Sequence, residues 1–393
     1  MKSIPNIIVV GSGFSGSVIA RKIAEELDLP VTIIERRSHI AGNMYDEFDE
    51  NGILIQKYGP HFINTNNYNV ILYLSQYSKL VKHDPKLLSF IDGEYVRLPF
   101  NFKTAQQLLG DEKSISVISK LRRMFKGRDR VPVYELLDSG DEEIVNFANL
   151  VIDKGYRNYV AKQWGLQPEK VDRYIFQRNP IVMSFDERYL AGDFQYIPEN
   201  GYTELFNRLL DHPNIKVRLN CDVREKMLLD EASHTIFYDG KKVDLLVYTG
   251  AIDELFDYKY GDLPYRSLRF DYQYYDKPSV LPSEIVAFPE AEGYTRRTEY
   301  RKVNNQIECT SSKSVVITEY PKAYDRKGND DPYYPIVNPE NTDRYQKYEE
   351  EAKNYGNVVL CGRLAEFKYY NMDICIEHAL EKYDLIKNKL QEL

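Results

Sequence analysis

The chain begins with alternating apolar and amphipathic segments of the lengths that strands and helices take. The pattern predicts a strand over residues 4–10, a helix over 14–28 and a second strand, VTIIE, over 31–35. Strand, helix and strand in this order form the βαβ unit of a parallel sheet. The first apolar segment is short and runs straight into glycines, so it predicts a buried strand and not a signal peptide.

Similar short apolar strands return later in the chain, at 215–223, 245–250 and 357–366, and a helix is predicted from about Asn371. Residues 53–63 predict a strand pair or a passage from strand to loop. We therefore expect one parallel sheet assembled from separated segments. We assign this domain to residues 1–79, 197–247 and 323–393.

Two further segments interrupt that sheet. From about Tyr68 to Lys170 the pattern is mostly helical, and we assign 80–172 to a helical domain. Residues 264–320 alternate with period two and are rich in tyrosine, as antiparallel strands are. We assign a sheet domain that binds the substrate to residues 173–196 and 248–322.

The turn after the first strand carries GSGFSG, a G-x-G-x-x-G sequence that opens a helix. Gly11 permits the tight turn, Gly13 lets the backbone approach two phosphates, and Gly16 allows close packing of the helix. The N-terminus of the helix then faces the negative charge. Glu35 ends the second strand, where a carboxylate can hold a ribose hydroxyl. These features predict a dinucleotide site.

Two segments favour a flavin over a nicotinamide dinucleotide. RRSHIAGNMYD after Glu35 combines basic residues with a small residue and glycine, as in flavoproteins whose second loop meets the pyrophosphate. Near the C-terminus, Gly362 and Arg363 follow a strand, and Asn371 can cap the next helix. Its dipole would favour the negative charge of a reduced flavin, although an ordinary capped surface helix is the alternative. The predicted fold is α/β, with an FAD-binding Rossmann-like domain, a helical insertion and an antiparallel β-sheet domain.

Composition narrows the class of partner. The 393 residues carry a formal net charge of −8, which argues against a general nucleic-acid binder. No apolar run approaches the about 18 residues that a membrane span needs. The 4 cysteines lie far apart, so a reduced cytoplasmic protein with buried thiols is expected, and no metal site is predicted.

Tyrosine is unusually frequent, with 33 Tyr and 17 Phe beside 1 Trp, and many tyrosines lie near arginines after residue 155. Such residues either fill half-buried positions or form a site that stacks flat groups and donates hydroxyls to phosphate. Composition alone favours the first interpretation. Taken singly, Arg178 or Arg296 would be a surface ion pair, and His61 is equally well explained as structural or catalytic.

The order of the motifs resembles one family over nearly the whole chain. The motifs are VGSG, KYGPHF, LPFN, KQWG, YRSL, YTR, EYP, DPYYP and GRLAEFKYY. No single one is specific, but the ordered set is similar to the bacterial UDP-galactopyranose mutases, which are flavin enzymes. The resemblance implies FAD, active in its reduced form, and a nucleotide-diphosphate sugar as substrate.

The resemblance also implies roles for individual residues. Arg178 and Arg296 match the two arginines that hold the diphosphate of the UDP-sugar, and His61 matches a histidine near flavin and sugar; these are the expected catalytic residues. The expected substrate-binding residues are Tyr159, Trp164, Arg178, Tyr189, Arg266, Arg296, Tyr320 and Tyr369. The expected cofactor-binding residues are Gly11, Gly13, Gly16, Glu35, Arg36, Gly42, Asn43, Asn64, Val223, Arg363, Asn371 and Met372.

The family reaction interconverts UDP-galactopyranose and UDP-galactofuranose with no net redox change. N5 of the reduced flavin acts as the nucleophile at the anomeric carbon and displaces UDP. The resemblance therefore implies an isomerase whose arginines stabilise the departing UDP, while the Trp164-to-Tyr189 segment closes to exclude water. It also implies a cytoplasmic homodimer that serves cell-surface polysaccharide synthesis.

The sequence departs from the family pattern near the flavin and the sugar. Asn64 replaces the second histidine of H-x-x-H, Asn371 replaces the aspartate of KYYDM, and residues 83–90 do not match the sugar-side loop. A related UDP- or dTDP-sugar, such as an N-acetylated or deoxy sugar, therefore stays open as substrate. Two other hypotheses are a flavin oxidase of the amine-oxidase type, which leaves the Arg and Tyr set unexplained, and a non-catalytic binding module, against which the intact glycine loop argues.

Overall fold

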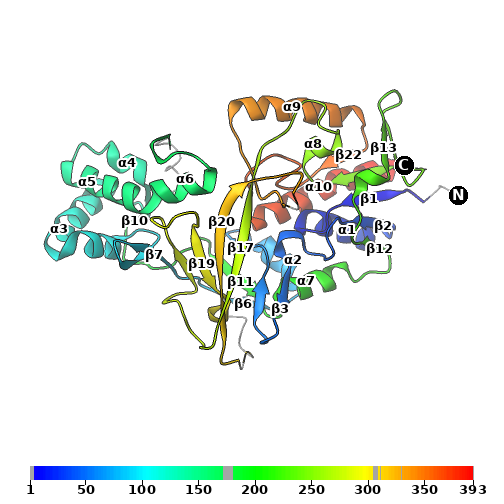
Figure 1. Cartoon of the computed structure of the whole chain (residues 1–393). Coiled ribbons are helices and arrows are strands. Elements are labelled where there is room, and N and C mark those ends of the chain that lie inside the picture. The colour runs from blue at the N-terminus through cyan, green and yellow to red at the C-terminus, as the bar shows by residue number, and fades with distance from the viewer. Residues whose placement is uncertain (1–3, 171–179, 304–308, 310, 329, 393) are drawn as a thin grey trace.

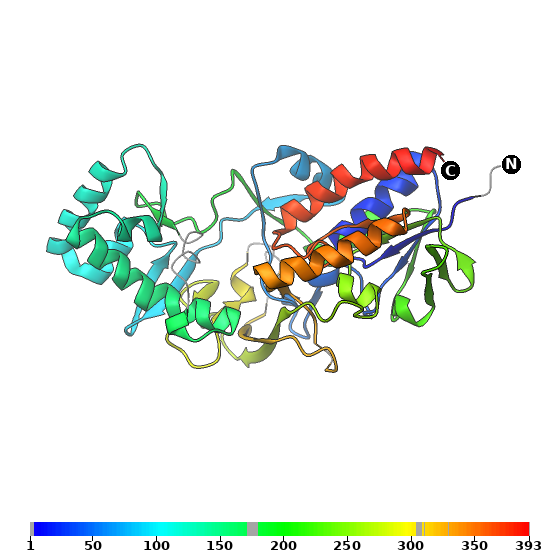
Figure 2. The same ribbon diagram turned by 90° about the horizontal axis from the view of Figure 1, so that it is seen from above.

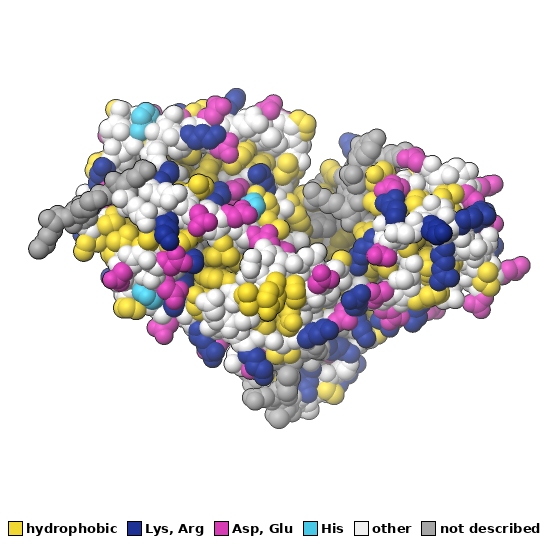
Figure 3. Space-filling view, turned by 180° about the vertical axis from the view of Figure 1, so that it is seen from behind, with side chains coloured by type: hydrophobic (Ala, Val, Ile, Leu, Met, Phe, Trp, Pro, Cys, Tyr) yellow, Lys and Arg dark blue, Asp and Glu magenta, His cyan; other side chains and the backbone are white. Residues whose placement is uncertain are grey.

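The computed structural model describes residues 4–170, 180–303, 309, 311–328 and 330–392. Figure 1 shows a parallel-sheet half that holds both termini, a helical lobe at the opposite end, and long antiparallel strands between them. Within the described residues, no helix combines the length and apolarity needed to cross a membrane. On the face seen in Figure 3, Lys and Arg are interspersed with Asp and Glu, so that face carries no broad basic surface.

The parallel sheet has five strands in the order β12-β2-β1-β16-β22. Their bounds are β1 (Ile7–Val10), β2 (Val31–Ile34), β12 (Ile215–Arg218), β16 (Leu245–Tyr248) and β22 (Val358–Leu360). β1 is central, since Ile7 pairs with Val31 on one side and Leu245 on the other. The strands predicted from the apolar runs are confirmed, and they come from separated parts of the chain.

Alternate residues of β1 enter two cores, one on each face of the sheet. Ile7 and Val9 join a core with the helices α1 and α10, which lie against each other (Figure 2), whereas Ile8 joins a core with α8 and α9. Fully burying each such aliphatic side chain stabilises the fold by roughly 1.5–3 kcal/mol. The helices are α1 (Phe14–Leu27), α2 (Tyr68–Ser75), α7 (Gly201–Leu210), α8 (Ile252–Leu255), α9 (Pro339–Asn354) and α10 (Met372–Glu392).

The second large sheet runs through the middle of the molecule in the order β21-β17-β20-β19-β18-β7-β8. Among its described pairs, only β18 with β7 is parallel. The strands are β7 (Leu87–Ile91), β8 (Glu94–Leu98), β17 (Tyr265–Tyr275), β18 (Ile285–Ala287), β19 (Arg296–Glu299), β20 (Ser314–Ala323) and β21 (Tyr334–Pro335). The antiparallel strands predicted over 264–320 are confirmed.

The segment 80–98 was predicted to be helical, and this is wrong. It forms β6 (Leu80–Lys82) and the β7–β8 hairpin, whose turn places Asp92 and Gly93 at φ of 50° and 84°. Asp-Gly is the sequence that such tight hairpin turns favour, because both central residues have positive φ. The unit predicted as helical over 80–172 therefore begins with strands of the central sheet.

The helical lobe follows from Phe102 and has its own apolar core. A capping box starts its first helix: Asn101 accepts from the amide of Thr104, and the Thr104 hydroxyl accepts from the amide of Asn101. A π-helical turn, η2 (Ile152–Arg157), leads into α6 (Asn158–Trp164), the helix nearest the central sheet. The other elements are α3 (Phe102–Met124), β9 (Arg130–Pro132), α4 (Val133–Leu137), α5 (Glu142–Val151), η3 (Pro168–Lys170) and β10 (Pro180–Val182).

Smaller sheets connect these parts. β11 (Phe194–Pro198), whose first residues were assigned to the antiparallel sheet domain, instead pairs with β5 (Ile63–Thr65) and β6. The remaining elements are η1 (Gly42–Met44), β3 (Asp46–Phe48), β4 (Leu54–Gln56), η5 (Val223–Glu225), β13 (Met227–Asp230), β14 (Thr235–Tyr238), β15 (Lys241–Lys242) and η6 (Tyr300–Lys302).

Candidate active site

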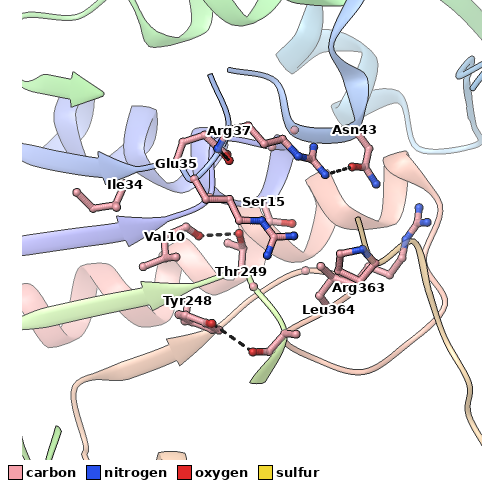
Figure 4. A pocket seen from close by; sticks show the side chains of 18 of the residues that line it. Val10, Ser15, Ile34, Glu35, Arg37, Asn43, Tyr248, Thr249, Arg363 and Leu364 are labelled. Atoms are coloured by element: carbon pink, nitrogen blue, oxygen red, sulfur yellow. Dashed lines mark hydrogen bonds between the residues drawn. The ribbon is translucent and has the colours of Figure 1, made fainter. Parts of the chain in front are cut away.

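The glycine loop between β1 and α1 is packed so tightly that side chains could not replace its glycines. Gly11 has a φ of +95°, and a Cβ there would lie 2.2 Å from Thr249 Oγ1, the hydroxyl that donates to the Val10 carbonyl (Figure 4). A Cβ on Gly16 would lie 2.0 Å from the Gly11 carbonyl oxygen. No side chain caps α1 at Gly13, so the first amides of the helix remain available to an anion.

A second loop approaches the first at its glycine. Gly42 has a φ of +55°, and a Cβ built on it would stand 3.0 Å from the Cα of Gly13. The amide of Ala41 donates to the Ser12 carbonyl at 3.1 Å and holds the two loops together. This is the contact that the RRSHIAGNMYD segment predicts for a flavin pyrophosphate site.

These loops open into a long pocket at the carboxyl edge of the parallel sheet (Figure 4). The space inside it, including open solvent at its mouth, is about 1200 Å³. The Glu35 carboxylate is held at its edge by Ser12, whose amide and hydroxyl donate at 2.9 and 2.8 Å. The predicted cofactor residues that line the pocket are Gly11, Gly13, Glu35, Arg36, Gly42, Asn43, Val223, Arg363 and Met372.

The other predicted cofactor residues stand elsewhere. Gly16 packs behind the loop, and Asn64 Oδ1 accepts a hydrogen bond from the amide of Gly192 at 2.9 Å. Asn371 is exposed and precedes α10, and its carbonyl accepts from the amide of Cys375. Asn64 and Asn371 therefore shape segments beside the pocket without lining it.

Two residues that the sequence analysis did not select join the pocket to the DPYYP segment. Arg37 pairs with Asp331 at 2.7 Å, donates to Asn43 Oδ1 at 2.9 Å, and lies over the ring of Tyr58. Arg36 is 3.5 Å from the same carboxylate. Asp331 thus anchors the chain just before Tyr334.

Tyr334 and Tyr369 form a stacked pair beside the pocket, with ring centroids 5.3 Å apart and an interplanar angle of 23°. The Arg363 guanidinium lies over both rings, at 5.2 and 5.8 Å, and donates to the Tyr333 carbonyl. The ring centroids of Trp164 and Tyr369 are 6.5 Å apart. Because Arg363 also lines the pocket, it joins the pocket to this aromatic group.

Arg296 is the second cation of this group and lies within electrostatic range of Tyr334. Its Nε donates to Glu319 at 2.6 Å, while Nη1 and Nη2 make no hydrogen bond with any part of the chain that the structure describes. Burial by itself lowers the pKa of the guanidinium, but the Glu319 carboxylate raises it well above its ordinary value. Arg296 therefore stays charged and can offer its terminal nitrogens to a second anion.

Tyr159 on α6 and Tyr189 lie within electrostatic range of Arg296. Burial raises the pKa of Tyr159, so its hydroxyl stays protonated and can donate to an anion. Tyr189 is 37% exposed, as a residue at the mouth of a cleft would be. Four tyrosines therefore surround Arg296 and Arg363, a group we call the aromatic–arginine cluster: Tyr159, Tyr189, Tyr334 and Tyr369.

His61 borders both parts of the site. Its Nδ1 lies 2.8 Å from the Gly59 carbonyl, and its amide donates to Gln56 Oε1. Burial, with the Arg363 cation, lowers the pKa of the imidazole to about 3. The ring is neutral at working pH, and since Nδ1 must donate to a carbonyl, Nε2 carries no proton and accepts.

Two predicted substrate residues are not brought into the cluster. Tyr320 packs with Arg269 at 4.0 Å and with Tyr294, on the face of β20 opposite to Glu319, because successive strand residues alternate. Arg266 donates to the carbonyls of Lys162 and Gln163 at the end of α6. Arg178 lies outside the described residues.

In the aromatic–arginine cluster, the site residues that the sequence analysis missed are Glu319 and Tyr334. Both stand inside motifs that it did recognise, EYP and DPYYP. The alternation along β20 is the signal that separates Glu319 from Tyr320, since Glu319 pairs in register with Arg296 and Tyr320 with Arg269. Without strand register, the two tyrosine motifs look equivalent.

Comparison with known proteins gives a consistent result. The sequence profile of UDP-galactopyranose mutase matches residues 154–369, and that of an NAD(P)-binding Rossmann-like domain matches residues 9–77. A dTDP-fucopyranose mutase from Escherichia coli is 33% identical over 390 residues, covering 97% of this chain and 98% of that protein. A UDP-galactopyranose mutase from Mycoplasma genitalium is 31% identical over 383 residues, covering 96% and 93%.

Solved structures share the fold at lower identity. A crystal structure of reduced UDP-galactopyranose mutase superposes with a TM-score of 0.68 at 16% identity, covering 98% of this chain and 94% of that one. A putrescine oxidase variant superposes with a TM-score of 0.57 at 14% identity, covering 98% and 99%. At these identities the structures establish the architecture alone, which mutases and amine oxidases have in common.

Proposed function

The chain belongs to the UDP-galactopyranose mutase family, and on that premise we propose that it interconverts UDP-galactopyranose and UDP-galactofuranose. It is thus an isomerase of nucleotide sugars that changes the ring size from pyranose to furanose. The observation that carries the proposed substrate is the position of Arg296. Its terminal nitrogens make no hydrogen bond among the described residues, and the hydroxyls of Tyr159, Tyr189 and Tyr334 lie within electrostatic range of it, as the diphosphate of a sugar nucleotide requires.

We propose that the pocket holds FAD in its reduced form, as befits a family of FAD-dependent mutases. The residues fit this group. Gly13 and Gly42 lack side chains that would fill the space for a pyrophosphate, and Glu35 lies where it can accept a hydrogen bond from a ribose hydroxyl. The N-terminus of α10, which starts at Met372, supplies amides for the flavin ring. Bound there in reduced form, FAD would supply an electron-rich ring nitrogen that attacks the anomeric carbon.

The proposed task of the aromatic–arginine cluster is to hold the diphosphate while the bond to the sugar breaks. Arg296, and Arg178 from outside the described residues, would neutralise the charge that develops on the departing UDP. The hydroxyls of Tyr334 and Tyr369 would donate to the same phosphates and retain UDP for its return. Tyr159 and Trp164 would hold the base on α6.

His61 is proposed to orient a sugar hydroxyl and not to carry a proton. A pKa of about 3 makes the imidazole a poor general base near neutral pH, where good acid–base catalysts have pKa values close to the working pH. Its unprotonated Nε2 can still accept a hydrogen bond and so fix which hydroxyl faces the anomeric carbon.

dTDP-fucopyranose is the second candidate substrate. The Escherichia coli dTDP-fucopyranose mutase is 33% identical to this chain, and Asn64 and Asn371 depart from the UDP-galactose pattern close to the pocket. Fucose lacks the 6-hydroxyl of galactose, so the two sugars differ in one hydrogen-bonding group. A site that hydrogen-bonds a substrate hydroxyl discriminates strongly against the analogue without it.

The test is an assay of dithionite-reduced protein with UDP-galactofuranose, UDP-galactopyranose and dTDP-fucopyranose, with products separated by chromatography. We expect UDP-galactopyranose from UDP-galactofuranose, and no turnover by oxidised protein. Conversion of the dTDP-sugar alone would transfer the assignment to the second candidate. Oxygen consumption with an amine, without ring isomerisation, would instead support an oxidase.

We also propose a cytoplasmic homodimer. The 4 cysteines are free thiols, which suits a reducing compartment. Light scattering after size exclusion would give twice the 46.1 kDa chain mass if the dimer forms.

A further inference from the structure

Lys162 makes an unusual set of contacts at the edge of the aromatic–arginine cluster. Its side chain leaves α6, and its ammonium donates to the carbonyls of Phe288, Ala291 and Tyr294, each at 2.7 Å. Three acceptors match the three N–H bonds of a charged lysine. The lysine therefore holds together three carbonyl groups of the loop between β18 and β19.

Among the described residues, no carboxylate forms an ion pair with Lys162. Glu290 of the same loop is 3.6 Å from Lys154 and accepts from the amide of Asp92, while Glu292 is exposed. The Arg266 cation, which donates to the Lys162 carbonyl, is engaged by main-chain carbonyls of α6. In the described part of the chain, three carbonyl dipoles hold the ammonium, and burial lowers the pKa of Lys162 to about 8.

The contact joins two walls of the cluster that come from different parts of the chain. On α6, Tyr159 precedes Lys162 by one helical turn and Trp164 follows it. On the other side, the clamped loop ends at Thr295, whose amide donates to the Glu319 carbonyl, and the next residue is Arg296. The position of the loop thus sets where β19, and with it Arg296, begins.

We propose that Lys162 is a positioning residue that fixes the spacing between the α6 wall, which carries Tyr159 and Trp164, and Arg296. The proposal rests on the proposed function, in which these residues bind the base and the diphosphate of one nucleotide. A rigid span of the correct length lowers the ordering cost of binding, since neither wall has to be positioned by the ligand.

The clamp is complete only when the amine is charged. A neutral amine has two N–H bonds and a lone pair, so one carbonyl would lose its donor and face the lone pair. Nucleotide affinity should therefore fall as the pH rises through about 8. Arg296, Tyr159, Tyr189 and Tyr334, whose pKa values are all raised, should keep their protons over this range. A purely structural lysine would give no such profile.

The experiment measures binding of UDP and dTDP by calorimetry between pH 7 and 9, on the FAD-loaded protein. We expect Lys162→Met to weaken binding about tenfold at pH 7 and to abolish the pH dependence. Lys162→Arg keeps a permanent charge and should bind without a fall at pH 9. Titration of the nucleotide itself is common to all the proteins and cancels in their comparison.

Lys154→Met is the matched control. Lys154 also faces this loop, 3.6 Å from Glu290, but it is half-exposed, pairs with Asp92 and touches no carbonyl of the clamp. We expect its nucleotide affinity to stay within twofold of the wild-type value. FAD content should be equal in all the variants, because Lys162 does not line the pocket.

Hydrogen exchange of the amides between Phe288 and Thr295 tests the clamp without any ligand. It should accelerate at least tenfold in Lys162→Met and stay unchanged in Lys154→Met. Unchanged exchange, or wild-type affinity with an unchanged pH profile in Lys162→Met, would overturn the proposal. Failure of the wild-type protein to bind either nucleotide would instead refute the proposed function, and the exchange measurement would still decide on the clamp.

Discussion

The dinucleotide pocket and the aromatic–arginine cluster meet at Arg363, yet they are built in opposite ways. The pocket is formed chiefly by main chain: glycines that exclude Cβ atoms, strand ends and helix N-termini. The cluster is formed by side chains delivered from α6, β19, β21 and the segment before α10. A site made of backbone tolerates no added atoms, whereas a site made of side chains is sensitive to the loss of single groups.

Arg296→Ala tests the side-chain half and should have the largest effect. Removing a cation that stabilises transition-state charge lowers kcat about 10²–10³-fold. FAD content should stay at the wild-type level, because the pocket lacks Arg296. Steady-state kinetics and the flavin spectrum measure the two effects. Arg269→Ala, on the opposite face of the sheet, is the control, and a comparable loss of kcat there would contradict the assignment.

Gly42→Val tests the main-chain half. The residue adopts a φ of +55°, and its Cβ would crowd the Gly13 Cα at 3.0 Å. Strain of about 1–3 kcal/mol should weaken FAD binding roughly ten- to hundredfold. Equilibrium titration of the apoprotein with FAD gives the affinity. Gly52→Val has a φ of +74° and open space around its Cβ, so it carries the backbone strain without the crowding. Equal losses in both would show that the contact between the two loops is irrelevant.

Tyr334→Phe and Tyr320→Phe sharpen the boundary of the cluster. A hydrogen bond to a charged group is worth about 1.5–3 kcal/mol, so loss of the Tyr334 hydroxyl should weaken UDP binding at least tenfold. Tyr320 lies on the other face of β20, and its variant should bind UDP within twofold of wild type. Calorimetry measures the UDP affinity of both variants. A larger loss in Tyr320→Phe than in Tyr334→Phe would show that Tyr320 binds the substrate, as the sequence motif suggested.

The last prediction concerns stability in acid, not binding or turnover. His61 has a pKa of about 3 when folded and near 6.5 when unfolded, so below pH 6.5 the unfolded chain binds more protons. The folded state should lose stability as the pH falls from 6.5 toward 3, by at most about 1.4 kcal/mol per unit. In denaturant unfolding, the free energy of unfolding of His61→Gln should fall less steeply than that of the wild type between pH 6.5 and 3. An identical pH dependence in the two proteins would show that groups other than His61 cause the loss of stability in acid.

The two halves also differed in how well the sequence predicted them. Short motifs encode the local backbone geometry at Gly11, Gly13, Glu35 and Gly42, and all four residues line the pocket. Asn64 was also predicted to bind the cofactor, but it does not line the pocket. Its side chain instead accepts a hydrogen bond from Gly192, which is distant in the chain, and no local sequence pattern predicts that bond.

The cluster depends on strand register, which the motifs do not contain. A shift of one residue along β20 exchanges Glu319 for Tyr320 at the Arg296 side. The strands of 80–98 were missed for a related reason, since their apolar residues are short runs that also suit a buried helix. In both places, partners far away in the chain decided the outcome.

Arg363 belongs to both the dinucleotide pocket and the aromatic–arginine cluster. It lines the pocket and lies over both stacked tyrosines of the cluster, so a charge or ligand on one side acts on the other through the same guanidinium. Linkage makes such an effect reciprocal: if a reduced cofactor tightens nucleotide-sugar binding, the nucleotide sugar tightens reduced cofactor by the same factor. Substrate would then raise the midpoint potential of the bound flavin and protect its electrons from oxidants.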